Sequence, residues 1–144
     1  MARSEKLFID TEFNGFGGQL ISMGIAANDG REFYEVLPLP QTTTLWVREK
    51  VIPVLEKPPV PKTIFQAKLQ NYLQEYPGFT LIADWPEDIA HFNQSLIVGP
   101  GQMMRLPSYK MEVVRGLPSH STKPHNALSD ARALRTAYNN KYPR

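Results

Sequence analysis

The chain of 144 residues has no cysteine, and none of its apolar runs approaches the roughly 20 residues that a membrane-spanning helix needs. The lack of cysteine excludes a disulfide framework and a thiolate zinc site. Repeats and low-complexity tracts are also missing, and no signal-peptide pattern precedes the first apolar run. These absences predict a cytoplasmic protein without a membrane partner.

Net charge is small as well, because 16 Lys and Arg against 14 Asp and Glu give +2 at pH 7. The charge is uneven along the chain. Residues 101–144 carry eight Lys and Arg against two acids, whereas the first hundred residues carry eight against twelve. A basic C-terminal part can neutralise the phosphates of a bound strand, although basic faces are also common in other proteins. The pattern favours a nucleic-acid partner without choosing between RNA and DNA.

The hydrophobic pattern predicts one α/β domain spanning residues 1–144. Strands are expected at residues 6–13, 20–27, 32–37, 79–83 and 111–114, with a hairpin turn at Asn28-Asp29-Gly30. Helices are expected near residues 45–52, after a capping box at residues 63–66, from Pro86, and from residue 126 to about 142. This order predicts a mixed five-stranded sheet flanked by helices.

Two carboxylates lie close together at the end of the first expected strand. Because alternate side chains of a strand share a face, Asp10 and Glu12 project together, and Thr11 and Phe13 point the other way. Like charges at this separation repel unless a cation lies between them, and hard oxygen ligands suit Mg²⁺ or Mn²⁺ rather than zinc. The pair is a candidate metal site, although a solvated strand end would show the same spacing.

The last expected helix carries an aspartate on its apolar side. One arc of its helical wheel consists of Ala127, Ala131, Leu134, Ala137 and Tyr138, and the opposite, solvent-facing side consists of Arg132, Arg135 and Asn139. Asp130 falls inside the apolar arc, where a carboxylate is costly unless it is paired or metal-bound. His125 precedes the helix and can lean over the same end, although a histidine there also fits a surface or capping role.

Two further acids compete for one place after the fourth expected strand. Asp88 falls in the first turn of the helix that begins at Pro86, near the carboxyl end of the strand, where ligands gather in open α/β sheets. Asp84 ends the strand, and its ordinary role there is to cap the helix. The sequence favours Asp88 as the site carboxylate and leaves open whether Asp84 also binds metal or replaces it.

Three segments resemble the exonuclease motifs of the DEDDh branch of the DnaQ-like, RNase T-like superfamily: Asp10-Thr11-Glu12-Phe13, Asp88 with Phe92 four residues on, and His125-Asn126-Ala127-Leu128-Ser129-Asp130. Residues 46–48 and 51–55 further resemble the short mycobacterial-type 3′-to-5′ exoribonucleases, and the resemblance spans nearly the whole chain. The second motif departs from the family pattern. The family usually has an aromatic residue just before this Asp and Asn or a similar polar residue four before it, where this chain has Glu87 and Asp84.

The resemblance implies an RNase H-like fold with the first strand in the centre of the sheet, and a DEDDh exonuclease that removes 5′-mononucleotides from the 3′ end of single-stranded RNA or DNA, with RNA favoured. Asp10, Glu12, Asp88 and Asp130 would hold two divalent cations, Mg²⁺ or Mn²⁺. His125 would be the general base, since an imidazole exchanges protons near neutral pH.

Three apolar residues near the first motif are candidates for substrate binding. Phe13, Phe16 and Met23 are expected to pack against the terminal base, because stacking tolerates any base. Each of them also fits an ordinary place in the core. The oligomeric state stays open, with a homodimer among the alternatives.

Two other functions use related arrangements of residues. A catalytically silent RNase H-like module would bind single strands in the same groove, but it would be expected to have lost a ligand or the histidine, and none is lost. An endonuclease of the RNase H or integrase type also uses carboxylates and two metals, but it does not need His125. Mononucleotides, internal fragments or no products from an end-labelled strand distinguish the three.

Overall fold

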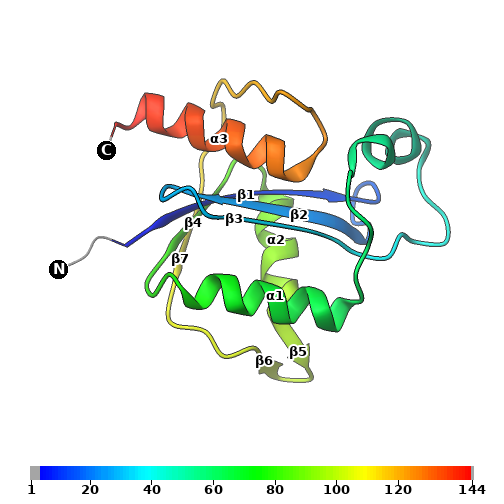
Figure 1. Ribbon diagram of the computed structural model, residues 1–144, viewed down its shortest axis with the longest axis horizontal. Helices are drawn as coiled ribbons and strands as arrows, with labels where there is room; N and C mark the ends of the chain where they lie inside the picture. The colour runs from blue at the N-terminus through cyan, green and yellow to red at the C-terminus, as the bar shows by residue number, and fades with distance from the viewer. Residues whose placement is uncertain (1–3, 144) are drawn as a thin grey trace.

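The computed structural model describes residues 4–143 and contains a five-stranded mixed sheet between helices (Figure 1). In spatial order the strands are β3 (Glu32–Val36), β2 (Leu20–Ala27), β1 (Lys6–Phe13), β4 (Thr80–Ala83) and β7 (Lys110–Val113). β1 lies in the centre, antiparallel to β2 and parallel to β4. The predicted five-stranded mixed sheet with a central first strand is therefore confirmed.

Helices cover both faces of this sheet. α3 (Ala127–Lys141) lies on one face, and α1 (Lys62–Gln74) and α2 (Pro86–Ser95) lie on the other (Figure 1). Strand alternation divides the core accordingly: Leu7 and Ile9 of β1 join the cluster under α1 and α2, whereas Phe8 joins the cluster under α3. No helix within residues 4–143 is long and apolar enough to cross a membrane.

Two local predictions are wrong in part or in full, and one pair of strands was not predicted. The capping box at residues 63–66 does not form: Pro61 precedes α1, and the Gln66 amide instead donates to the carbonyls of Ser95 and Ile97. The short helix expected near residues 45–52 is present as two irregular helical turns, Val47–Val51 and Ile52–Val54. It does not end at Pro53, because Pro53 lies in the first turn of the second, where its missing N–H costs nothing. A short hairpin, β5 (Ile97–Gly99) and β6 (Gln102–Met103), was not anticipated.

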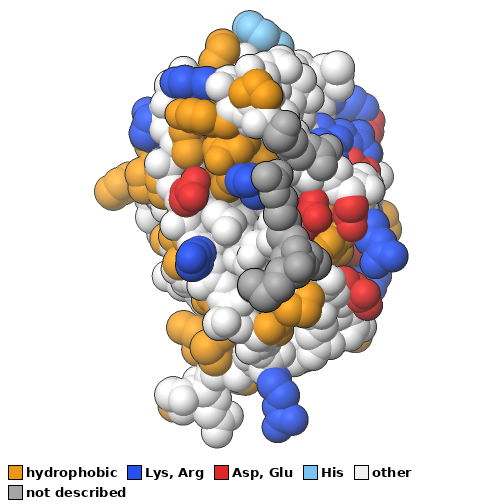
Figure 2. All heavy atoms as spheres, turned by 90° about the vertical axis from the view of Figure 1, so that its left-hand side faces the viewer, with side chains coloured by type: hydrophobic (Ala, Val, Ile, Leu, Met, Phe, Trp, Pro, Cys, Tyr) orange, Lys and Arg blue, Asp and Glu red, His pale blue; other side chains and the backbone are white. Residues whose placement is uncertain are grey.

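The outer side of α3 is also less solvated than predicted. Arg132 is exposed but pairs with Glu32 of β3, and half-buried Arg135 donates to the carbonyl oxygen of Ala27 at 2.8 Å. Half-buried Asn139 donates to the side chain of Asn28 at 2.8 Å. On the face shown in Figure 2, basic and acidic side chains are interspersed. Part of the basic charge of the C-terminal third therefore ties α3 to the β2–β3 hairpin.

Gly24 is where α3 lies directly against β2. A Cβ on Gly24 would lie 2.4 Å from the amide nitrogen of Leu128 and 2.5 Å from the carbonyl carbon of Ala127. Both neighbours are backbone atoms at the start of α3, which cannot move aside as a flexible side chain can. The absence of a side chain at Gly24 therefore sets how closely the helix approaches the sheet.

We expect Gly24→Ala to lower the free energy of unfolding by about 3 kcal/mol, at the upper end of the usual range for overpacking. Urea denaturation measures this change. The matched control is Gly99→Ala, whose Cβ would meet only the flexible side chain of Gln102 and should cost less than about 1 kcal/mol. Equal stability of the two variants would contradict the close approach.

Candidate metal centre

Asp10 and Glu12 lie on the face of β1 that α3 covers. Phe8, on the same face, packs against Tyr138 of α3 with ring centroids 5.3 Å apart. Thr11 points to the opposite side, toward α2, and its N–H and hydroxyl donate to Oδ1 of Asp88 at 3.2 and 2.6 Å. The strand thus presents two carboxylates directly and fixes a third through the residue between them.

The predicted acids lie in two groups beside one another. Oxygens of Asp10, Asp84 and Asp88 lie within 4.8 Å of one another, as do ligand atoms of Glu12, His125 and Asp130. The charges of Glu12 and Asp130 both act on Asp10, which links the two groups. A cavity of about 420 Å³ opens beside them, and its lining includes Asp10, Asp84, Asp130 and His120. We call these acids together with His125 the candidate metal centre.

Burial and mutual repulsion raise the pKa values of these carboxyls. The pKa of Asp10 is raised well above its ordinary value, first by burial and then by the charges of Asp88 and Glu12. Burial, followed by the charge of Asp130, raises the pKa of Glu12 to about 8. The pKa of Asp88 is raised to about 7 by burial, although the hydrogen bonds from Thr11 oppose this. The acids therefore cannot all be ionised near neutral pH without a compensating positive charge.

The donor set fits a divalent cation of the Mg²⁺ or Mn²⁺ type. Oδ2 of Asp10 and Oδ2 of Asp88 are both buried, and neither accepts a hydrogen bond from any residue in the described part of the chain. A buried carboxylate oxygen without a partner is costly. Hard cations prefer such oxygens, and a bound cation would remove both the desolvation cost and the repulsion.

Asp84 does not cap α2, so the predicted capping role is wrong. The N-cap residue is Trp85, and no side chain in residues 4–143 caps this helix end. The Asp84 carboxylate lies instead with Asp10 and Asp88, and burial raises its pKa. The presence of Pro86 directly after Trp85 was the available signal, because proline favours the first helical position and so makes Trp85, not Asp84, the N-cap residue.

The position of Asp84 changes what its substitution should do. We expect Asp84→Asn and Asp88→Asn each to weaken Mn²⁺ binding by about 10-fold or more, since each removes a negative charge from one group of ligands. Neither should cost the ~1 kcal/mol that loss of an N-cap costs. Isothermal titration with Mn²⁺ and thermal melting measure the two effects. Unchanged Mn²⁺ affinity in Asp84→Asn would remove Asp84 from the ligand set.

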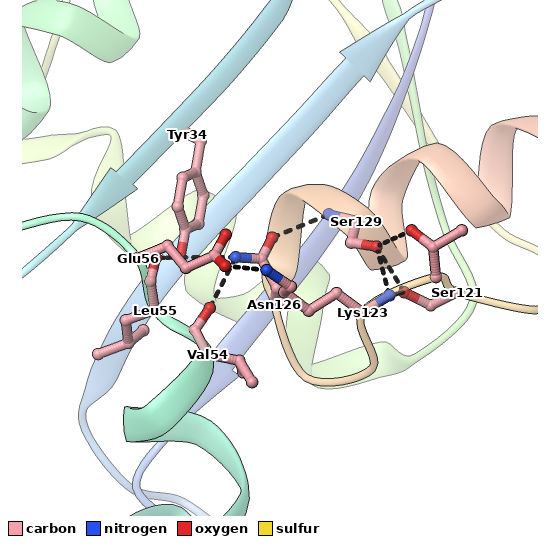
Figure 3. Close-up of polar contacts among 9 residues, drawn as sticks. Tyr34, Val54, Leu55, Glu56, Ser121, Lys123, Asn126 and Ser129 are labelled. Carbon is pink, nitrogen blue, oxygen red and sulfur yellow. Dashed lines mark hydrogen bonds and ion pairs between the residues drawn. The ribbon is translucent and has the colours of Figure 1, made fainter.

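His125 and Asp130 are held at the start of α3 by a cap and an irregular turn. The side chain of Asn126 accepts from the N–H of Ser129 at 3.0 Å and donates to the carbonyl oxygen of Val54 at 2.8 Å (Figure 3). The N–H of His125 donates to Asp130 at 3.1 Å. Asn at position 126, three residues before Ser129, was an N-cap signal that sequence reasoning did not use.

The segment before α3 is fastened to the irregular turns that end at Val54. Figure 3 shows Lys123 paired with Glu56, and Asn126 reaching toward Tyr34 and Val54. Trp46, at the start of those turns, packs edge-on against His125 with ring centroids 5.1 Å apart. Trp46 entered the sequence argument only through the family resemblance, because a contact between residues so distant in the chain has no local signal.

The three residues expected to contact a base differ in exposure. Phe16 is 99% exposed, and half-buried Phe13 packs on His91 with ring centroids 4.7 Å apart. Met23 is fully buried in the core under α1 and α2 and offers no surface to a ligand. Its position in β2 explains the difference, because helices cover both faces of that strand.

A metal-free protein should become less stable as pH rises. A carboxyl whose pKa is higher in the folded state keeps its proton there more tightly, so folding stability is lost as pH passes from the unfolded value to the folded one. This pH window runs from 3.8 to about 7 for Asp88 and from 4.5 to about 8 for Glu12. Asp10→Asn removes the charge that the others surround, so in EDTA its melting temperature should exceed that of the wild type increasingly across this window. If the difference in melting temperature between Asp10→Asn and the wild type shrank toward high pH, repulsion among these carboxylates would be contradicted.

An α/β protein with crowded carboxylates beside its central strand, two of which have a buried oxygen without a hydrogen-bond partner among the described residues, is suited to binding hard divalent cations. Two curated proteins give the family: 3′-5′ exoribonucleases of Mycobacterium tuberculosis, from strains CDC 1551 and H37Rv. Each is 32% identical to this chain over 146 aligned positions, covering 88% of this chain and 87% of its own length. No protein-family model matches the chain. The chain belongs to the family of these mycobacterial 3′-5′ exoribonucleases.

Proposed function

We propose that this protein is a metal-dependent 3′-to-5′ exoribonuclease that releases 5′-mononucleotides from the 3′ end of single strands. The observation that carries the proposal is the meeting of Asp10, Glu12, Asp88, His125 and Asp130 at one place. Membership of the exoribonuclease family supports the same activity. The motif order and the central first strand fit the DEDDh branch of the DnaQ-like superfamily with its RNase H-like fold.

Two divalent cations, Mg²⁺ or Mn²⁺, would be held by the two groups of acids. Asp10, Asp84 and Asp88 supply one set of oxygens, and Glu12 and Asp130 supply the other. When bound, such ions stabilise negative charge on a phosphate and favour ionisation of water. Thr11 contributes by fixing one oxygen of Asp88, which leaves the other oxygen available.

His125 is the proposed general base. Its ring lies with Glu12 and Asp130, where it can accept the proton of a water that attacks the phosphodiester. The contact with Trp46 restricts the ring, and the hydrogen bond from the backbone N–H of His125 to Asp130 fixes the backbone. These contacts orient the imidazole before substrate arrives, which is what efficient proton transfer requires.

The products of a labelled strand test the proposal. Single-stranded RNA and DNA carrying a 5′ label are incubated with the protein in Mg²⁺, in Mn²⁺ and in EDTA. We expect a ladder that shortens one nucleotide at a time from the 3′ end, faster on RNA, with 5′-mononucleotides as products and no reaction in EDTA. Internal fragments would indicate an endonuclease, and binding without products a silent module; either result overturns the proposal.

A further inference from the structure

Glu87 joins two exposed aromatic residues at the rim of the candidate metal centre. One oxygen of its carboxylate accepts from the backbone N–H of Gly17 at 3.3 Å, and the other accepts from the indole N–H of Trp85 at 3.1 Å. Phe16, next to Gly17, is 99% exposed, and Trp85 is 45% exposed. A single side chain thus connects the β1–β2 loop to the start of α2.

The loop that carries Phe16 is ordered and turns the ring outward. Gly15 and Gly17 have φ values of 77° and 69°, a conformation that residues with a Cβ rarely adopt. The side chain of Asn14 accepts from the N–H of Thr44 and donates to the carbonyl oxygen of Thr42. The exposure of Phe16 is therefore built into the turn, and the hydrophobic cost of exposing the ring is not relieved within this structure.

Arg115 places a positive charge on the same rim. Its guanidinium lies over the Trp85 ring, 4.8 Å from the ring centroid, and donates to the carbonyl oxygen of Asp84 at 2.7 Å. Residues 84 and 88, which flank Trp85 and Glu87, are two of the acids of the candidate metal centre. Scattered exposed aromatic residues are ordinary, but here one carboxylate bonds both the Trp85 ring and the backbone next to Phe16, and a guanidinium lies against Trp85, so the surface is organised.

We propose that Phe16, Trp85 and Arg115 form a binding site for the nucleotides that precede the 3′-terminal one. Bases would pack on the two rings, Arg115 would contact a backbone phosphate, and Glu87 would position the Trp85 ring and the backbone next to Phe16. Aromatic packing accepts any base, so this site selects single strands of two or more nucleotides without selecting sequence. The inference rests on the proposed exonuclease function, because that function brings a 3′ end to the carboxylates.

The intrinsic fluorescence of Trp85 tests the binding site without catalysis. The chain has two tryptophans, so Trp46→Phe leaves Trp85 as the single emitter. Titration with a single-stranded oligoribonucleotide in Ca²⁺ should quench or shift this emission, and Phe16→Ala should weaken the apparent affinity by about 10-fold or more. Saturable binding measured by anisotropy, with Trp85 emission unchanged, would overturn the inference.

Kinetics on two substrates separate this site from the chemistry. Trp85→Ala and Arg115→Ala should lower kcat/KM on an oligoribonucleotide by about 10- to 100-fold, mainly through KM, with little change on a nitrophenyl ester of one nucleotide. Tyr142→Ala is the matched control, since Tyr142 is 46% exposed at the far end of α3. Equal losses on both substrates would overturn the inference.

A double-mutant cycle tests the positioning role of Glu87. Glu87→Ala should raise KM on the oligoribonucleotide, and Glu87→Gln, which keeps a carbonyl oxygen for one of the two donors, should recover part of the loss. Because Glu87 acts through the rings, its effect should not add fully to that of Trp85→Ala. Full additivity would contradict the positioning role. If the wild type hydrolyses neither substrate, the proposed function fails and the fluorescence titration alone decides the binding site.

Discussion

Asp10→Asn is expected to lower exonuclease turnover by about 10³-fold or more while making the metal-free protein more stable. Activity is lost because Asp10 belongs to one group of acids and lies near the charges of the other, and charge stabilisation by bound metal is worth several kcal/mol of barrier. The metal-free variant gains stability because asparagine removes one of the mutually repelling negative charges. Turnover of a labelled strand in Mn²⁺ and melting in EDTA measure the two effects.

Lower turnover together with higher stability in EDTA distinguishes an acid that binds metal from an acid that stabilises the fold. Glu49→Gln is the control, since Glu49 is an exposed acid on the short turn Val47–Val51 and should alter neither quantity by much. An Asp10→Asn variant that is inactive and also less stable in EDTA would indicate a structural role. An active variant would refute the metal assignment.

His125→Ala is expected to slow turnover by about 10²- to 10⁴-fold, the range for loss of a general base. Mn²⁺ affinity should change little, because the carboxylates of Glu12 and Asp130 remain and imidazole is not a preferred ligand of hard cations. Single-turnover kinetics and Mn²⁺ titration check these outcomes.

His120→Ala is the comparison for this result. His120 lines the cavity beside Asp10 and Asp130, so it shares the surroundings of the site without belonging to either group of ligand atoms. We expect its loss to slow turnover by less than about 10-fold. A severe His120→Ala with a mild His125→Ala would mean that the base has been assigned to the wrong histidine.

The sequence predicted the parts of the site that depend on local periodicity. Strand alternation placed Asp10 and Glu12 together, and the helical wheel placed Asp130 on the apolar side of α3. Asp84 was misjudged because the direction of a side chain at a strand end depends on packing between elements. Pro86 and the N-cap position of Trp85 turn Asp84 away from the helix end.

Met23 shows where periodicity carries no information. Every residue of β2 is buried, because the strand is paired on both edges and covered on both faces. A period of two distinguishes inside from outside only when one face meets water. The burial of Met23 could therefore not be inferred from its neighbours in the sequence.

The backbone conformation at His125 sets thermal stability against the proposed activity. His125 has a φ of 74°, a region that costs a residue with a Cβ roughly 1 kcal/mol or more. Glycine adopts this conformation freely and asparagine tolerates it. A directed-evolution campaign that rewards heat resistance alone would therefore favour His125→Gly or His125→Asn and discard the proposed base. Libraries built on this scaffold should hold position 125 constant.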